Sequence, residues 1–168
     1  MKVIEPYYVI EDEIDVARIM STIERAGRTC YKSEGKIGDG TAEKFIAAII
    51  KRGHESVLEH EKITVRFICD RGVTHEMVRH RIASFSQEST RYCNYSQDRF
   101  GSELTFIKPC FWKEGEDDEK IKLWSDTMAF IEEKYNKMIE LGVKPEEARS
   151  ILPNSLKTEI VVTMNIRE

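Results

Sequence analysis

The most informative part of the sequence is the segment KITVRFICDRGVTHEMVRHRIASFSQESTR, Lys62–Arg91. It opens with alternating polarity, in which every second residue from Ile63 to Cys69 is apolar. This alternation predicts a half-buried strand. Thr74 then has the position and the side chain of an N-cap, so we expect a helix from there to about Ala83, followed by a polar loop.

The regions on either side predict further strands and helices. A first strand is expected at MKVIEPYYVI, where Pro6 favours a sheet edge or a bulge. Apolar residues at helical spacing predict helices over residues 14–31 and 117–141, and Gly142 stands where the second should stop. Thr41 is the expected N-cap of another helix.

Two more strands and a short helix complete the expected elements. The strands are LTFIKP and LKTEIVVTMN, and the helix opens at Pro145. Because strands and helices do not strictly alternate, we predict an α+β fold with a mixed or antiparallel sheet flanked by helices.

The length of 168 residues fits one domain with a real core. The last residues, TMNIRE, follow directly on a predicted strand and would leave that strand without a cover. We therefore expect a single domain over residues 1–168 that has been cut from a longer protein.

Composition excludes several classes of protein. Hydrophobic residues make up 40% of the chain and charged residues 33%, which is typical of a soluble globular protein. No apolar run approaches the roughly 18 residues of a spanning helix, and the N-terminus is no ordinary signal peptide. The net charge of -4 argues against nucleic-acid binding. We expect a cytoplasmic protein without membrane or nucleic-acid partners, whose four cysteines are reduced and mostly fill the core.

The triplet Arg79-His80-Arg81 concentrates positive charge at the expected end of the helix. Consecutive helical residues are rotated by about 100°, so the two arginines point to different sides and each can face a different anion. The helix dipole also favours cations at this end, so a cationic cap at the surface is the alternative.

The residues that follow carry hydroxyl, amide and guanidinium donors. They are Ser84, Ser86, Gln87, Ser89, Thr90 and Arg91. Guanidinium groups pair with phosphate through two hydrogen bonds, and hydroxyls complete such a site. This composition indicates a phosphate site, and a solvated polar loop is the alternative. The chain has neither GxxxxGK[ST] nor GxGxxG, so a Walker loop and a dinucleotide turn are unsupported.

The histidines and Cys110 give weaker signals. The segment HESVLEH, His54–His60, fits neither HExxH nor HxxEH, and His75 and His80 do not share a helical face. We therefore expect no metal site. Cys110 is a candidate nucleophile, but no neighbouring histidine or helix N-terminus is visible to lower its pKa, and a buried thiol is the alternative.

Three motifs together resemble one family. With Arg79-His80-Arg81 followed by seven residues and then Ser89, the chain resembles the flavin-dependent thymidylate synthases. Upstream, GHESVLEH is similar to the family's GHxSxxEH-type segment. Downstream, ARSILPNSLKTEIVVTMNIRE resembles its ARxxLPxxxxTxxxxTxNxRE segment. The matches lie in the family's order and span about residues 53–168.

The resemblance implies a site for FAD. In the family the RHR triplet contacts the flavin, Ser56 matches a hydroxyl residue that touches FAD from a neighbouring subunit, and Gln87 occupies a usually acidic position that also reaches the flavin. The residues expected to bind FAD are Ser56, Arg79, His80, Arg81, Gln87, Asn165, Ile166 and Arg167.

The resemblance also implies a site for dUMP. Residues 88–91 match the loop that holds the nucleotide's phosphate, and Arg79 neighbours both ligands. The residues expected to bind dUMP are Glu76, Arg79, Glu88, Ser89, Thr90, Arg91 and Arg149.

The implied activity is the reductive methylation of dUMP to dTMP by a single catalytic domain. Methylenetetrahydrofolate gives the carbon, and FAD reduced by NADPH gives the hydride. The family assembles as a homotetramer with active sites shared between subunits. Its uracil-activating arginine lies on a later helix, past the end of this chain, so we assign no catalytic residue and expect weak or absent turnover.

Three other readings remain open. A non-catalytic nucleotide- or flavin-binding protein would use the same loop. An RNA-binding module would need a basic face with aromatic platforms, against which the overall charge argues. A transferase with a cysteine nucleophile would depend on Cys110.

Overall fold

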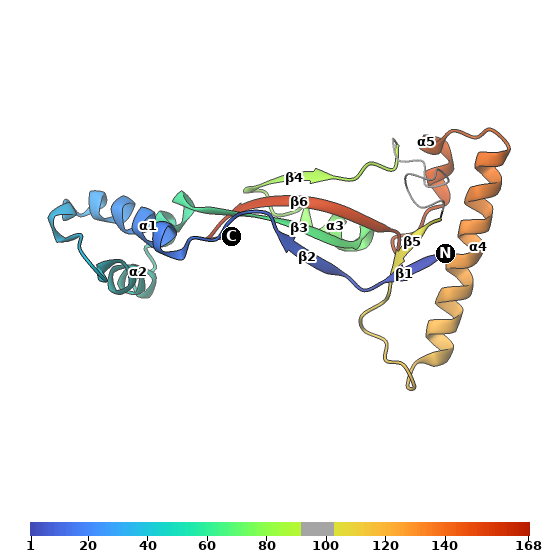
Figure 1. Ribbon diagram of the computed structural model, residues 1–168, viewed down its shortest axis with the longest axis horizontal. Coiled ribbons are helices and arrows are strands. Elements are labelled where there is room, and N and C mark those ends of the chain that lie inside the picture. Colours follow the sequence, from blue (N-terminus) through green and yellow to red (C-terminus); the bar gives the residue numbers. More distant parts are fainter. Residues whose placement is uncertain (92–102) are drawn as a thin grey trace. The chain divides into compact units, whose positions relative to one another are not determined.

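The computed structural model of the protein describes residues 1–91 and 103–168 (Figure 1). Its strands are β1 (Lys2–Ile4), β2 (Tyr7–Ile10), β3 (Lys62–Asp70), β4 (Ala83–Gln87), β5 (Thr105–Ile107) and β6 (Lys157–Asn165). Its α-helices are α1 (Val16–Cys30), α2 (Thr41–Lys51), α3 (Arg71–Met77), α4 (Asp118–Glu140) and α5 (Pro145–Ala148). Its 3-10 helices are η1 (Glu34–Lys36), η2 (Glu55–His60) and η4 (Arg149–Ile151).

The strands form two sheets. Strands β1 and β5 are a parallel pair in which Val3 lies opposite Phe106. The other strands form a sheet in the order β2-β3-β6-β4. The predicted α+β class is therefore confirmed. The single N-terminal strand is wrong, because β1 and β2 belong to different sheets. Pro6, which lies between them, has no N–H with which to continue a ladder.

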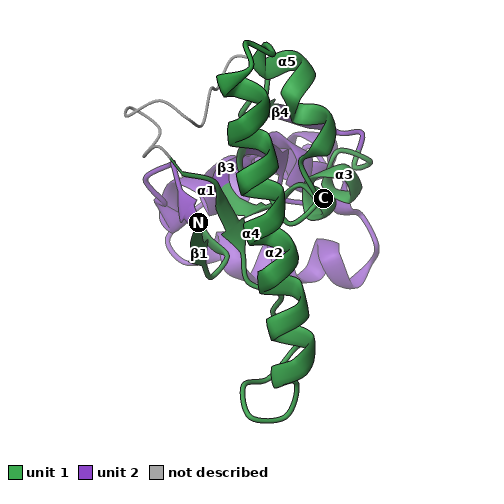
Figure 2. Ribbon diagram, turned by 90° about the vertical axis from the view of Figure 1, so that its right-hand side faces the viewer, with its two compact units in different colours: residues 1–8, 67–80, 86–160 green, residues 9–66, 81–85, 161–168 purple. Residues whose placement is uncertain are grey.

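The chain divides into two compact units (Figure 2). Unit 1 comprises residues 1–8, 67–80 and 86–160, and unit 2 comprises residues 9–66, 81–85 and 161–168. That residues 1–168 act as a single catalytic domain stays a prediction.

The core of unit 1 gathers around α4 and β5. The long helix expected over residues 117–141 is confirmed as α4, and Gly142 follows it with the positive φ of 84° that favours glycine. Phe106 and Tyr135 are 0% exposed, and Trp124 donates a hydrogen bond from Nε1 to Ser155 Oγ (3.1 Å). The core residues are Leu104, Phe106, Met128, Tyr135, Ala148 and Leu156.

The core of unit 2 lies between α1 and α2. Its buried residues are Ile19, Ile23, Ile49 and Val57. Arg28 lies over the Phe45 ring, 4.4 Å from its centroid, and pairs with the buried carboxylate of Glu24 at 2.8 Å. Gly27 permits this packing, because a Cβ at that position would lie 2.5 Å from Phe45 Cε1.

Two expected N-caps are wrong by one and four residues. The N-cap of α2 is Gly40, and Thr41 is the first helical residue. The N-cap of α3 is Asp70, whose carboxylate accepts a hydrogen bond from Val73 N (2.8 Å). Thr74 is instead a fully buried residue inside the helix. Thr41 and Thr74 both have side chains that suit a helix start. In α3, however, Asp70 is as good an N-cap as Thr74 and comes earlier in the chain.

The segment after α3 also differs from expectation. The helix ends at Met77, so Arg79-His80-Arg81 lies beyond its last turn. The first part of the expected polar loop is β4, whose side chains alternate between partly buried and exposed. Ala83 and Phe85 alternate there with serines, which is the period of a strand.

The end of β3 is buried on both faces. Ile68 and Cys69 are neighbours, so they point to opposite faces, and they are only 2% and 7% exposed. The half-buried strand expected there is therefore wrong at this end. The expectation that cysteines mostly fill the core holds for Cys69 but is wrong for Cys30 and Cys110, which are exposed. Cys93 lies outside the described residues.

No helix in the described part of the chain combines the length and the apolar character that a bilayer crossing requires.

We predict that the described cysteines react with iodoacetamide at very different rates. Burial raises the pKa of Cys69 to about 11, so at about pH 8 only roughly one thiol in a thousand is ionised. Peptide mapping by mass spectrometry should find Cys30 and Cys110 alkylated in the folded protein, and Cys69 alkylated only after denaturation. Equal labelling of all three in the folded state contradicts the burial of β3.

Candidate functional site

Arg79 and Glu76 form an exposed ion pair at the end of α3. Arg79 Nη1 lies 2.8 Å from Glu76 Oε2, and the two side chains are 75% and 74% exposed. Such a solvated pair contributes little to stability. The guanidinium is therefore accessible to an anionic ligand, and His80 and Arg81 beside it are exposed as well.

Gln87 attaches the end of β4 to the interior of unit 1. Its Nε2 donates to Thr74 Oγ1 (2.9 Å) and to Thr158 Oγ1 (3.3 Å). Both threonines are 0% exposed, so these hydrogen bonds are shielded from water. The main chain is held too, because Glu88 N donates to Glu159 O on β6 (2.8 Å).

Arg71 joins the same network from the start of α3. Its Nη1 lies 3.4 Å from both Glu88 O and Thr158 Oγ1, and its main-chain N donates to Asn154 O (2.9 Å). Among the described residues, no buried side-chain nitrogen or oxygen lacks a hydrogen-bond partner. The network is thus satisfied without a ligand, and it fixes the start of the 88–91 loop.

The rest of the loop gathers donors beside η4. Arg149 Nη1 donates to Thr90 Oγ1 (3.4 Å), and Arg149 Nε donates to Glu146 O (3.1 Å). Ser89 Oγ accepts a hydrogen bond from Arg91 N (3.2 Å). Thr90 is buried, whereas Arg91 and Arg149 are exposed. Two hydroxyls and two guanidinium groups are therefore offered by one short loop and one helix end, a set that suits a phosphate.

Lys157 pairs with the acidic member of the loop. Its Nζ lies 3.2 Å from Glu88 Oε2 and 2.5 Å from Glu159 Oε1. Burial lowers the pKa of Lys157, but hydrogen bonds and charge from Glu159 and Glu88 outweigh burial and hold that pKa above its ordinary value. The ammonium group is therefore charged at neutral pH.

A second group of expected residues lies in unit 2, after β6. Asn165 Oδ1 accepts hydrogen bonds from Arg167 N (2.9 Å) and Glu168 N (3.2 Å). Arg167 pairs with Glu59 and lies 3.8 Å from Glu55 Oε2. The hydrogen bond to Glu59 raises the pKa of Arg167.

The 3-10 helix η2 supplies these two carboxylates and also carries Ser56, which is exposed. Ile166 N donates to Glu61 O (3.0 Å), directly after η2. The structure thus brings the segment 165–167 next to the 3-10 helix that carries Ser56. The order of the motifs along the sequence does not show this contact.

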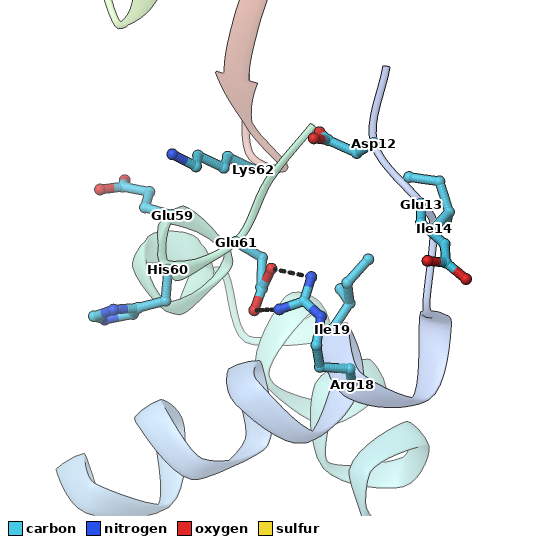
Figure 3. A pocket seen from close by; sticks show the side chains of 9 residues that line it. All are labelled: Asp12, Glu13, Ile14, Arg18, Ile19, Glu59, His60, Glu61 and Lys62. Carbon is cyan, nitrogen blue, oxygen red and sulfur yellow. Dashed lines mark hydrogen bonds and ion pairs between the residues drawn. The ribbon is translucent and has the colours of Figure 1, made fainter. Parts of the chain in front are cut away.

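A cavity of about 420 Å³ in unit 2 lies beside this group (Figure 3). Arg18 and Glu61 face each other across two hydrogen bonds of 2.9 and 3.2 Å. Glu59 lines the cavity and also pairs with Arg167. The remaining lining residues are Asp12, Glu13, Ile14, Ile19, His60 and Lys62.

The expected residues fall into two sets. The expected dUMP residues Glu76, Arg79, Glu88, Ser89, Thr90, Arg91 and Arg149 all belong to unit 1. Of the expected FAD residues, Arg79, His80 and Gln87 belong to unit 1, and Ser56, Arg81, Asn165, Ile166 and Arg167 belong to unit 2. That these residues bind FAD and dUMP stays a prediction, including for Gln87, whose amide nitrogen is engaged by two threonines.

Three residues of the described network were not predicted to belong to a site. Arg71 and Lys157 are single cations in charged surroundings, and Thr74 was interpreted as a helix cap. Thr158 could have been found, because it is the first threonine of the downstream motif.

A protein-family model, described as thymidylate synthase complementing protein, matches residues 14–168. Among curated proteins, the flavin-dependent thymidylate synthase of Pyrococcus furiosus is 41% identical over 143 residues, covering 84% of this chain and 57% of the relative. The Pyrococcus horikoshii protein of the same name is 44% identical over 134 residues, covering 79% and 54%. The Pyrococcus abyssi protein is 39% identical over 158 residues, covering 90% and 63%. The chain thus spans 54–63% of the length of these relatives.

Among solved structures, the crystal structure of a UMP/dUMP methylase PolB from Streptomyces cacaoi bound with 5-Br dUMP matches with a TM-score of 0.80. The match covers 99% of this chain and 76% of that chain, at 20% sequence identity. At this identity the likeness shows a shared fold.

We predict that Thr158→Val destabilises the protein although it keeps the shape of the side chain. The change removes the hydroxyl that Gln87 and Arg71 share, and leaving buried donors with fewer partners costs about 1–2 kcal/mol. The free energy of unfolding, measured by urea denaturation, should fall by that amount.

The control for this variant is Thr127→Val on α4, where the hydroxyl is exposed and bonds only to the Leu123 carbonyl within the helix (2.8 Å). If both variants unfold at the same urea concentration, the buried network contributes nothing measurable.

Proposed function

The chain belongs to the family of thymidylate synthase complementing proteins, and we propose that it serves the reductive methylation of dUMP to dTMP. In this reaction methylenetetrahydrofolate supplies the one-carbon group, and NADPH supplies the reducing equivalents through FAD. Because the chain spans only part of the length of its relatives, the proposal concerns the activity of the whole protein to which these residues belong.

The donor set at the 88–91 loop is the observation that carries the proposal. A nucleoside monophosphate has a doubly charged phosphate, which requires several donors and at least one cation. Ser89, Thr90 and Arg91 offer them from the loop, and Arg149 adds a guanidinium group that is already in contact with Thr90. We assign the phosphate of dUMP to this place, and we assign Glu76 and Arg79 to the binding of the same nucleotide.

The charges of the other set fit FAD. A dinucleotide has a diphosphate, and each unit offers exposed cations to an anion: Arg79 in unit 1, and Arg81 and Arg167 in unit 2. The partners of Arg79 and Arg167 are carboxylates at the surface, which an anionic ligand can replace at little cost. When bound, FAD would supply hydride transfer, and the protein would supply binding and orientation.

The chain's own contribution to the reaction is then electrostatic. Groups of the protein that stabilise the negative charge developing on the uracil ring during methylation would promote the reaction without a protein nucleophile. The proposal requires no cysteine nucleophile, and Cys110 lies at the exposed surface in the turn after β5.

We extend the proposal to the assembly. We propose that the protein forms a homotetramer with shared active sites, in which Ser56 reaches the FAD of a neighbouring subunit. The cytoplasmic location stays a prediction of the same kind.

We predict that two arginine substitutions separate the two ligands. Arg91→Ala should weaken dUMP binding about 10- to 100-fold, because a charge-assisted contact with phosphate is lost, while FAD binding persists. Arg79→Ala should abolish FAD binding. Calorimetry with dUMP and the visible absorbance of the purified protein with added FAD measure the two effects.

Arg25→Ala, an exposed arginine on α1 in unit 2, is the matched control and should change neither ligand. If neither Arg79→Ala nor Arg91→Ala alters either affinity, the assignment of both sites is wrong.

A further inference from the structure

Lys157, Glu88 and Glu159 form a compact charge cluster where β4 and β6 run side by side. The main-chain hydrogen bond from Glu88 N to Glu159 O (2.8 Å) places the two carboxylates next to each other. Lys157 Nζ contacts both of them, at 3.2 and 2.5 Å. The side chains of Lys157 and Glu88 are only 20% and 18% exposed, so water screens their charges poorly.

The position of Glu88 poses an electrostatic problem for a phosphate site. Glu88 directly precedes the three donors Ser89, Thr90 and Arg91. Its carboxylate can accept hydrogen bonds but cannot donate any to an anion. A partly buried carboxylate with no compensating cation would repel a phosphate dianion bound at the neighbouring residues.

We propose that Lys157 is a positioning residue that makes the 88–91 loop selective for a phosphate-bearing nucleotide, by holding the Glu88 carboxylate and offsetting its charge. This inference rests on the proposed dUMP site and adds to it a residue that acts through Glu88. The loop then presents its donors and the Arg149 guanidinium group to the ligand, while the one acidic side chain is bound to β6.

The charge state of the cluster agrees with this role. Glu159 and Glu88 together keep the pKa of Lys157 above its ordinary value despite burial. The cluster carries two negative charges and one positive charge, and removal of the ammonium group would leave two adjacent carboxylates beside the loop.

The test is a double-substitution cycle on the 168-residue chain, with dUMP and deoxyuridine as probes. Lys157→Met keeps an unbranched stem of similar length but has no charge, and it should weaken dUMP binding by about tenfold or more, because one partner of a shielded charge pair is lost. Deoxyuridine, measured by competition against dUMP, lacks the phosphate and should lose much less affinity.

The second substitution shows whether Lys157 acts through Glu88. Adding Glu88→Gln to Lys157→Met removes the carboxylate that Lys157 no longer contacts and should restore dUMP affinity to within about threefold of the unsubstituted chain. Lys137→Met, on an exposed lysine of α4 that pairs with Glu140 at 3.0 Å, changes the net charge equally and should leave dUMP affinity as it is.

Several outcomes overturn the inference. Unchanged dUMP affinity in Lys157→Met does so, as does a loss that Glu88→Gln fails to restore, or an equal loss for deoxyuridine. If Lys157→Met does not fold, Glu88→Gln alone decides. The inference requires dUMP to bind at least as tightly as to the unsubstituted chain, because the carboxylate beside the loop is gone while Lys157 still pairs with Glu159, and weaker binding contradicts it. If the unsubstituted 168-residue chain binds no dUMP, the proposed dUMP site at the 88–91 loop is refuted, and the inference with it.

Discussion

The candidate site depends on one constraint, the attachment of the 88–91 loop to two buried hydroxyls. Thr74 on α3 and Thr158 on β6 are inaccessible to water, and both accept a hydrogen bond from the Gln87 amide. Arg71 bonds to Thr158 and to the carbonyl of Glu88. Buried polar groups must find partners, so the loop is held where these partners are. The donors that we propose for the phosphate are therefore ordered by the protein's own hydrogen bonds.

This arrangement separates holding the loop from binding the ligand. Gln87, Arg71 and the threonines point inward, whereas Arg91 and Arg149 are exposed. A site whose donors are already placed binds an anion without first ordering a flexible segment, which favours affinity. The expected FAD residues of unit 2 have a similar local support, because Asn165 and the carboxylates of η2 fix Arg167 in place.

Periodic patterns predicted the long elements well, and the short strand β5 and the short helix α5 were also found, whereas the start of α3 was misplaced and β4 was missed. The apolar spacing along α1 and α4 marked both helices to within about two residues. The start of α3 was misplaced because Asp70 and Thr74 are both good N-caps, and only the fold shows that Thr74 is buried. In β4 the strand period is present, because Ala83 and Phe85 alternate with serines, but the polar side chains around it were interpreted as a loop. The spacing of the motifs identified the loop. The pairing of Lys157 with Glu88 depends on the register of β4 and β6, and this register cannot be read from the spacing of motifs in the sequence.

The most direct test of this account is a crystal structure of the 168-residue chain with dUMP. The account predicts that the phosphate lies within hydrogen-bond distance of donors from Ser89, Thr90 or Arg91 and of the Arg149 guanidinium group, with Gln87 still bonded to Thr74 and Thr158. A phosphate bound away from this loop, or a loop that leaves the two threonines when the nucleotide binds, would contradict it.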